Sequence, residues 1–124
     1  GNLLYICKWS KMDKFRTIVT YKNHFEEFIT YQSPKVRKKI YWTFLLIEDS
    51  RYVPEKYLKH IEGTEGLYEI RVQFGNDIFR IFCFFDKGHL IILANAFTKK
   101  TQKTPRQEIS KALKIMEEYH EEKK

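Results

Sequence analysis

A lysine-rich stretch near the C-terminal end is the part of this sequence best suited to hold an anion. Between Lys87 and Arg106 there are five basic residues and no acid, and Lys99, Lys100 and Lys103 are among them. The stretch leads into a predicted helix, whose unpaired backbone N–H groups and dipole also favour negative charge. We therefore expect this segment to hold phosphate groups, and a solvated basic loop without a partner is the alternative.

Two arginines lie on neighbouring predicted strands upstream of this stretch. Alternation along residues 67–74 places Glu69, Arg71 and Gln73 on one face of the first strand. On the next strand Arg80 shares its face with apolar residues, where an unpaired charge is costly to bury. Two interpretations follow. Arg80 forms a salt bridge with Glu69 or another acid, or Arg71 and Arg80 face an open groove and meet an anion there.

The titratable residues form none of the standard catalytic sets. The four histidines are scattered without metal-ligand spacing, and the sequence contains no Gly-rich phosphate loop and no Gly-x-Ser-x-Gly motif. We therefore predict neither a metal ion nor a cofactor. His60, just before the paired strands, is the one histidine expected to approach the groove.

Cleavage of RNA by the substrate's own 2′-hydroxyl suits this set of residues, because it requires no metal and no protein nucleophile. The protein must align that hydroxyl with the phosphorus and stabilise the added negative charge, which arginine and lysine can do. Glu69, two residues from Arg71 on the same face, is the candidate general base.

Apolar periodicity and turn residues predict the elements that position these side chains. Strands are expected at Phe15–Tyr21, Leu67–Phe74, Ile78–Phe85 and His89–Phe97, and helices at Lys22–Gln32, from Ser33-Pro34 to Ile47, and after Thr104. Ser33 is the expected N-cap of the second helix, and Thr104, Pro105 and Gln107 suggest a capping box for the last one. The connector Arg51–Gly66 is expected to contain a short helical turn around Tyr57–Ile61. The predicted fold class is α+β, in the order β-α-α-β-β-β-α, with an antiparallel meander sheet packed by helices.

Length and composition limit the possible organisation of the chain. The 124 residues fit one domain, and a hydrophobic content of 43% supplies a core. The net charge of +7 favours a polyanionic partner. Cys7 and Cys83 make neither a disulfide framework nor a metal set, and the apolar runs are too short to span a bilayer, so we expect a cytoplasmic protein. Residues 1–13 are interpreted as an N-terminal extension and residues 14–124 as the folded domain.

Three segments together resemble the RelE/HigB toxin superfamily, in particular its phage-derived, HigB-like branch. They are Gly66–Val72, Phe79–Phe82 and the run Phe97–Pro105, in the element order given above. The resemblance implies a RelE-like fold and a toxin of a type II toxin–antitoxin pair. It implies an endoribonuclease (an mRNA interferase) that cuts mRNA in the ribosomal A site, leaving a 2′,3′-cyclic phosphate. The implied partners are the ribosome, mRNA and a cognate antitoxin, often of helix-turn-helix type.

The residues and the resemblance together give a predicted site. The predicted catalytic residues are Arg71, Arg80, Glu69 and Lys100, and the predicted RNA-binding residues are Lys99, Lys103, Phe97 and Gln73. Phe97 could stack on a base or belong to the core. Glu69 occupies a position that is lysine in the RelE branch, and no tyrosine follows the basic loop, so the general acid is unassigned.

Two other functions are compatible with the same resemblance. The ParE branch resembles this fold and targets DNA gyrase without cutting nucleic acid. An inactive relic that only binds an antitoxin is the second alternative. The paired strand arginines favour the endoribonuclease.

Overall fold

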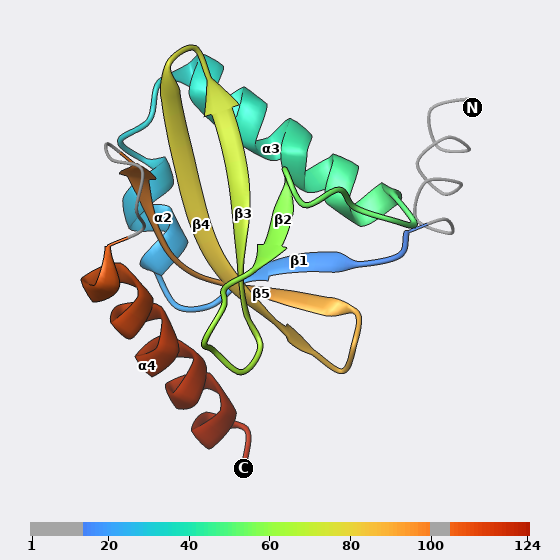
Figure 1. The fold of residues 1–124 in the computed structure, drawn as a ribbon, viewed down its shortest axis with the longest axis vertical. Helices are drawn as coiled ribbons and strands as arrows, with labels where there is room; N and C mark the ends of the chain where they lie inside the picture. Colours follow the sequence, from blue (N-terminus) through green and yellow to red (C-terminus); the bar gives the residue numbers. More distant parts are fainter. Residues whose placement is uncertain (1–13, 100–104) are drawn as a thin grey trace.

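The computed structural model describes residues 14–99 and 105–124, and these form one five-stranded sheet with helices on both faces (Figure 1). The elements are β1 (Thr17–Thr20), α2 (His24–Ile29), α3 (Pro34–Asp49), β2 (Leu58–His60), β3 (Leu67–Phe74), β4 (Asp77–Asp86), β5 (Leu90–Lys99) and α4 (Arg106–Glu122). The strand order across the sheet is β1-β5-β4-β3-β2. The predicted α+β class is confirmed.

Strands β3, β4 and β5 form the predicted antiparallel meander, with ends within two residues of those expected. Two short turns fix its register. Gly75 has a φ of 61° at the first loop position between β3 and β4, as a type II′ turn requires. Lys87 and Gly88 both have positive φ in the three-residue connection between Asp86 and Leu90 that joins β4 to β5.

The pairing of the two edge strands of the sheet was not predicted from the sequence, and one of them was not predicted to be a strand. The helical turn expected around Tyr57–Ile61 is wrong, because Leu58–His60 pairs with β3 as an antiparallel strand. Arg71 donates its backbone N–H to Tyr57 O at 2.9 Å and continues this pairing. At the other edge β1 lies within the predicted strand Phe15–Tyr21 and runs parallel to β5. Both pairings join segments far apart in sequence, so local periodicity does not reveal them.

Helices α2 and α3 cover one face of the sheet, over a core that includes Phe25, Ile40, Ile47, Ile70 and Ile81. Ile40, Ile47, Ile70 and Ile81 are completely buried. Helix α3 starts where the sequence predicts, and Ser33 Oγ accepts the Val36 N–H at 3.2 Å. Helix α2 is shorter than the predicted Lys22–Gln32.

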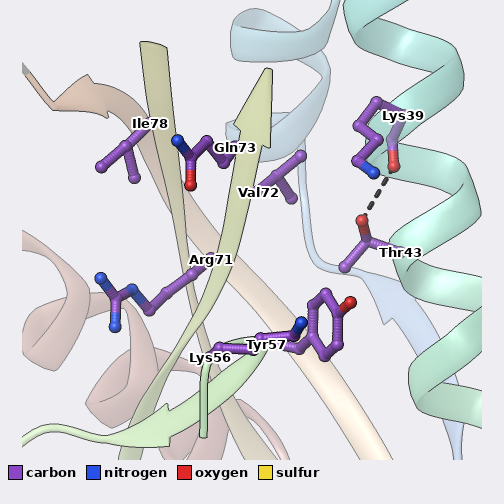
Figure 2. Close-up of a pocket in the computed structure, with 8 residues that line it drawn as sticks. All are labelled: Lys39, Thr43, Lys56, Tyr57, Arg71, Val72, Gln73 and Ile78. Atoms are coloured by element: carbon purple, nitrogen blue, oxygen red, sulfur yellow. Dashed lines mark hydrogen bonds between the residues drawn. The ribbon is translucent and has the colours of Figure 1, made fainter. Parts of the chain in front are cut away.

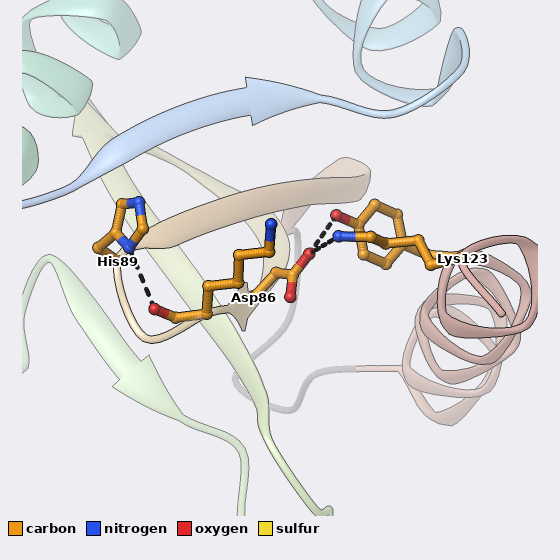
Figure 3. Close-up of polar contacts among 5 residues, drawn as sticks. Asp86, His89 and Lys123 are labelled. Atoms are coloured by element: carbon orange, nitrogen blue, oxygen red, sulfur yellow. Dashed lines mark hydrogen bonds and ion pairs between the residues drawn. The ribbon is translucent and has the colours of Figure 1, made fainter.

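Helix α4 packs on the opposite face, where Ala112 and Ile115 are buried against a second apolar cluster. The helix begins at Arg106 with Pro105 in the N-cap position, one residue later than the capping box predicts, and Thr104 lies outside the described residues. Its C-terminal end is fastened to the end of β4. Asp86 Oδ2 accepts a hydrogen bond from Tyr119 OH at 2.6 Å and a second from Lys123 Nζ at 2.5 Å, which is also an ion pair (Figure 3).

Within residues 14–99 and 105–124, no helix is long and apolar enough to cross a membrane.

Candidate functional site

Five charged side chains gather on the α4 face of the sheet, in the part that α4 leaves uncovered. Cross-strand partners point to the same face, and the register pairs Lys59 with Glu69 and Arg71 with Arg80. Lys99 follows Phe97, the β5 partner of Arg80, by two residues and therefore shares this face. We call Lys59, Glu69, Arg71, Arg80 and Lys99 the charged cluster. Four cations and one carboxylate give it a positive balance.

Helix α4 covers only one half of this face. Its apolar stripe packs on Phe82, Phe84 and Ala94, which lie toward the β4–β5 turn. The charged cluster lies on the same strands toward the β3–β4 turn, where the face changes from apolar to charged. One half of this face therefore belongs to the apolar core under α4, and the other half carries the charged cluster.

A buried ion pair forms the base of the cluster. Arg80 donates to Glu69 Oε1 at 2.5 Å, and the two residues are only 3% and 4% exposed. This is the salt bridge that the sequence offered as one of its two interpretations. Each partner keeps one buried polar atom that finds no partner within the described parts of the chain, Arg80 Nε and Glu69 Oε2. The pair thus neutralises one arginine and leaves the other cations to act on an anion.

Arg71 lies directly across the strand pair from Arg80 and is partly exposed. Burial lowers the pKa of Arg80, and the positive charge of Arg71 lowers it further, whereas Glu69 opposes both effects. Two guanidinium groups side by side repel one another, and an anion between them would remove that repulsion. The arrangement is therefore prepared to accept negative charge.

Lys99 experiences the same positive surroundings from β5. Burial lowers the pKa of its ammonium group, and the charges of Arg80, Arg71 and Lys59 lower it as well, with Glu69 acting in the opposite sense. A lysine with a lowered pKa gives up its proton more readily than an ordinary surface lysine. Lys99 is therefore a partly exposed cation of the cluster whose proton is held less tightly than that of an ordinary surface lysine.

The structure brings together some of the predicted site residues and separates others. Glu69, Arg71, Arg80 and Lys99 form one cluster, and Gln73 is exposed on the same face near the end of β3. Phe97 packs against the α4-side core, and its ring centroid lies 5.7 Å from that of Phe82. Lys100 and Lys103 lie outside the described residues.

For Lys59 and His60 the structure differs from the sequence-based prediction. Lys59 belongs to the charged cluster, but it lies in the segment predicted to be a helical turn, so periodicity gave no signal for it. His60 does not approach the cluster. Its partner Tyr68 belongs to the α2–α3 side of the sheet, and the two rings are 5.2 Å apart. In the described part of the chain, no group of three or more His, Cys, Asp or Glu residues could hold a metal ion.

A pocket of about 230 Å³ adjoins the cluster at the outer edge of β3 (Figure 2). Figure 2 shows Arg71 pointing away from α3, while Lys39 and Thr43 approach from α3 on the other side of the strand. Lys56 and Tyr57 close the pocket from the connector before β2. Arg71 therefore belongs both to the cluster and to the pocket wall.

One family model matches more than half of the chain. Residues 27–117 match the family described as phage derived protein Gp49-like (DUF891). The matched range contains the whole charged cluster and both helices that face each other across the sheet, α3 and most of α4. No curated protein matches the sequence.

Proposed function

The chain belongs to the Gp49-like family of phage-derived proteins, a family of RelE-like toxins of toxin–antitoxin systems, and from this premise we propose that it cleaves mRNA on the ribosome. The observation that carries the proposal is the charged cluster. Arg71 and Arg80 are paired in register, and Lys99 adds a third cation, on a half of the sheet face that α4 leaves uncovered. This arrangement is suited to a phosphate group.

The reaction needs only the substrate and these side chains. The 2′-hydroxyl attacks the adjacent phosphorus, so an O2′–P bond forms and the P–O5′ bond breaks. The 2′-hydroxyl proton passes to a base, and the leaving 5′-oxygen takes a proton from an acid. The products are a 2′,3′-cyclic phosphate and a 5′-hydroxyl. Cations that are already in place stabilise the charge that builds up on the phosphorane.

We assign the direct phosphate contacts to Arg71 and Lys99, since both are partly exposed. Arg80 is almost fully buried, and its ion pair with Glu69 fixes its charge beneath them. Lys99 is the proton donor in this scheme, because its lowered pKa favours release of the proton. Lys100, Lys103 and Gln73 are proposed to contact RNA.

Glu69 remains the proposed general base through Oε2, the oxygen that Arg80 does not hold. Because Oε2 is buried, this role requires that RNA binding opens the site to it. The pH dependence of single-turnover cleavage tests this role. Loss of the acidic limb of the rate profile in Glu69→Gln supports a base. A lower rate with the profile unchanged in shape shows that Glu69 only positions Arg80.

The family also indicates the partners. A toxin of a toxin–antitoxin pair requires an antitoxin that silences it, and we propose that a cognate antitoxin covers the charged cluster in the inactive state. The ribosome and the mRNA in its A site are the proposed targets, so the protein would act in the cytoplasm.

A translating extract with a reporter mRNA, read by primer extension, tests the proposal. We expect ribosome-dependent cuts at codon positions, and Arg71→Ala should reduce cutting by about 10²-fold or more. Lys114→Ala is the matched control, since Lys114 is an exposed cation on α4 outside the cluster, and it should cut normally.

Two outcomes would contradict the proposal and identify the alternative. Intact mRNA together with blocked DNA supercoiling by gyrase indicates a ParE-like inhibitor. Intact mRNA and unaffected gyrase indicate a protein that only binds its antitoxin. The buried Arg80–Glu69 pair is the feature that would then be purely structural.

A further inference from the structure

We propose that the outer edge of β3 carries a groove for single-stranded RNA, which takes a nucleotide next to the one held at the charged cluster. Two adjoining pockets form this groove, which we call the β3-edge groove. One is the pocket of about 230 Å³ that contains Lys39, Lys56, Tyr57 and Arg71. The other, of about 380 Å³, is lined by Lys35, Lys38, Lys39, Trp42 and Phe74. Lys39 is common to both pockets.

The charge of the groove points to a polyanion. Four lysines line it, three from α3 and Lys56 from the connector, and Arg71 joins it to the charged cluster. Among the residues that the structure describes, no acid lines either pocket. A row of cations without counterions is favourable for a nucleic-acid backbone, because binding releases the ions condensed on the phosphates.

The aromatic side chains indicate a single strand. Trp42 is 47% exposed, and its ring centroid lies 6.4 Å from that of the half-buried Tyr57. Lys39 Nζ lies 4.4 Å from the centre of the Trp42 ring, and Lys56 Nζ lies 4.9 Å from that of Tyr57. Cations beside the exposed Trp42 ring and the half-buried Tyr57 ring allow unpaired bases to stack while their phosphates are held. A duplex, whose bases are already stacked, does not permit this.

The backbone of β3 adds a donor to the groove. Strand β2 pairs no further along β3 than Ile70, and Arg71 gives its N–H to Tyr57 O. Within residues 14–99 and 105–124, no strand therefore lies beside β3 beyond Arg71 on this edge. Alternate residues point their N–H groups the same way, so the N–H of Gln73 faces the groove. A peptide strand could also add to such an edge. The lysines favour RNA over a peptide.

The groove continues from the proposed cleavage site. Arg71 lies opposite Arg80 in the sheet and also lines the pocket, whereas Lys39 approaches from the other side of the strand (Figure 2). A strand held at the cluster would therefore reach the groove by passing around the edge of β3. The biological role of the groove rests on the proposed function, but its affinity for RNA does not. Binding can therefore be measured separately from cleavage.

Fluorescence of Trp42 reports on the groove. The chain has two tryptophans, so Trp9→Phe leaves Trp42 as the only one. The probe is a ten-nucleotide oligoadenylate with 2′-O-methyl groups, which cannot undergo 2′-hydroxyl attack. We expect it to quench Trp42 as a base stacks on the indole ring. A hairpin duplex of the same 2′-O-methyl chemistry should quench it much less.

Charge variants in the Trp9→Phe background locate the site. Lys39→Ala combined with Lys56→Ala should weaken binding about tenfold or more and reduce the salt dependence by about 1.4 logarithmic units per decade of salt, for two lost phosphate contacts. Lys111→Ala combined with Lys114→Ala removes the same charge from exposed positions on α4 and should change affinity less than about twofold. Circular dichroism confirms that each variant is folded.

Several results overturn the proposal: absence of Trp42 quenching, equal binding of the duplex, or an equal loss in the α4 control, which would mean that only net charge matters. Arg80→Met separates this proposal from the cleavage proposal. It should abolish cutting and keep the quenching. Normal cutting by the Lys39→Ala, Lys56→Ala protein with unchanged RNA affinity refutes the groove and leaves the cleavage proposal intact.

Discussion

Replacing the buried Arg80–Glu69 pair with apolar residues should separate its effect on stability from its effect on function. Breaking a buried pair by removing one partner leaves an uncompensated charge and costs about 3–5 kcal/mol of the free energy of unfolding. Both residues are 3–4% exposed, but the pair lies beside other charged side chains and outside the two apolar clusters, so we expect the lower end of that range. Glu69→Leu and Arg80→Met should each cost about 3 kcal/mol.

The same magnitude can be expressed as a melting temperature. At about 2.1 cal/mol/K per residue, the unfolding entropy of a 124-residue chain is about 0.26 kcal/mol/K. A loss of 3 kcal/mol then lowers Tm by about 11 °C. A domain of this size has about 5–15 kcal/mol of stability, so single variants remain folded at room temperature.

The double variant, Glu69→Leu with Arg80→Met, should recover most of the lost stability, because neither charge remains to be desolvated. An apolar pair of similar volume is often as stable as the ion pair or more so. We expect it within about 1 kcal/mol of the wild type, which corresponds to a coupling energy of about 5 kcal/mol between the two sites. Urea unfolding followed by far-ultraviolet circular dichroism measures all four proteins.

The double variant should recover its free energy of unfolding but not its mRNA cleavage. The double variant lacks the fixed charge under Arg71 and should fail to cut mRNA although it is folded. Additive losses, with the double variant about 6 kcal/mol less stable than the wild type, would falsify the view that the two buried charges compensate one another. In that case Arg80 and Glu69 each stabilise the core through separate contacts.

Two further variants test the core packing and the contact of Asp86 with Tyr119 and Lys123 on α4. Ile81→Ala, at a completely buried position in the α2–α3-side core, should cost about 2–5 kcal/mol in the same urea assay, and a cost below 1 kcal/mol would contradict the close packing there. Hydrogen bonds from Lys123 and Tyr119 lower the pKa of Asp86 to about 2, below its ordinary value of 3.8. The resulting stabilisation is complete above pH 4 and is lost as the pH falls toward about 2. Asp86→Asn should therefore be less stable than the wild type at pH 6 but equal to it below pH 2. A stability difference that persists at pH 1.5 would refute the assignment.

Much of the fold followed from local rules in the sequence. Alternation separated Glu69 and Arg71 from the apolar face of β3, and the glycine turns set the meander in the predicted order. Ser33 predicted the start of α3 correctly, because an N-cap bond joins residues only three apart. The start of α4 was predicted one residue too early, because Pro105 and not Thr104 takes the N-cap position.

Tertiary pairing decided the composition of the site. The sequence could not choose between a salt bridge and an open groove for Arg80, since the answer depends on the register that brings Glu69 within 2.5 Å. Lys59 joined the cluster only because β2 pairs with β3, an interaction that overrode the helical pattern of its segment. The β3-edge groove likewise needs α3 and the connector beside the same strand.

The sequence by itself determined the class of the fold, the strands of the meander and the presence of strongly basic segments, because periodicity, turn residues and charge are local properties of the chain. Only the tertiary structure decided that β1 lies parallel to β5, that Glu69 neutralises Arg80, and that Arg71 and Lys99 remain partly exposed beside that pair. Each of these depends on contacts between residues distant in sequence, whose free energies are set by register and burial.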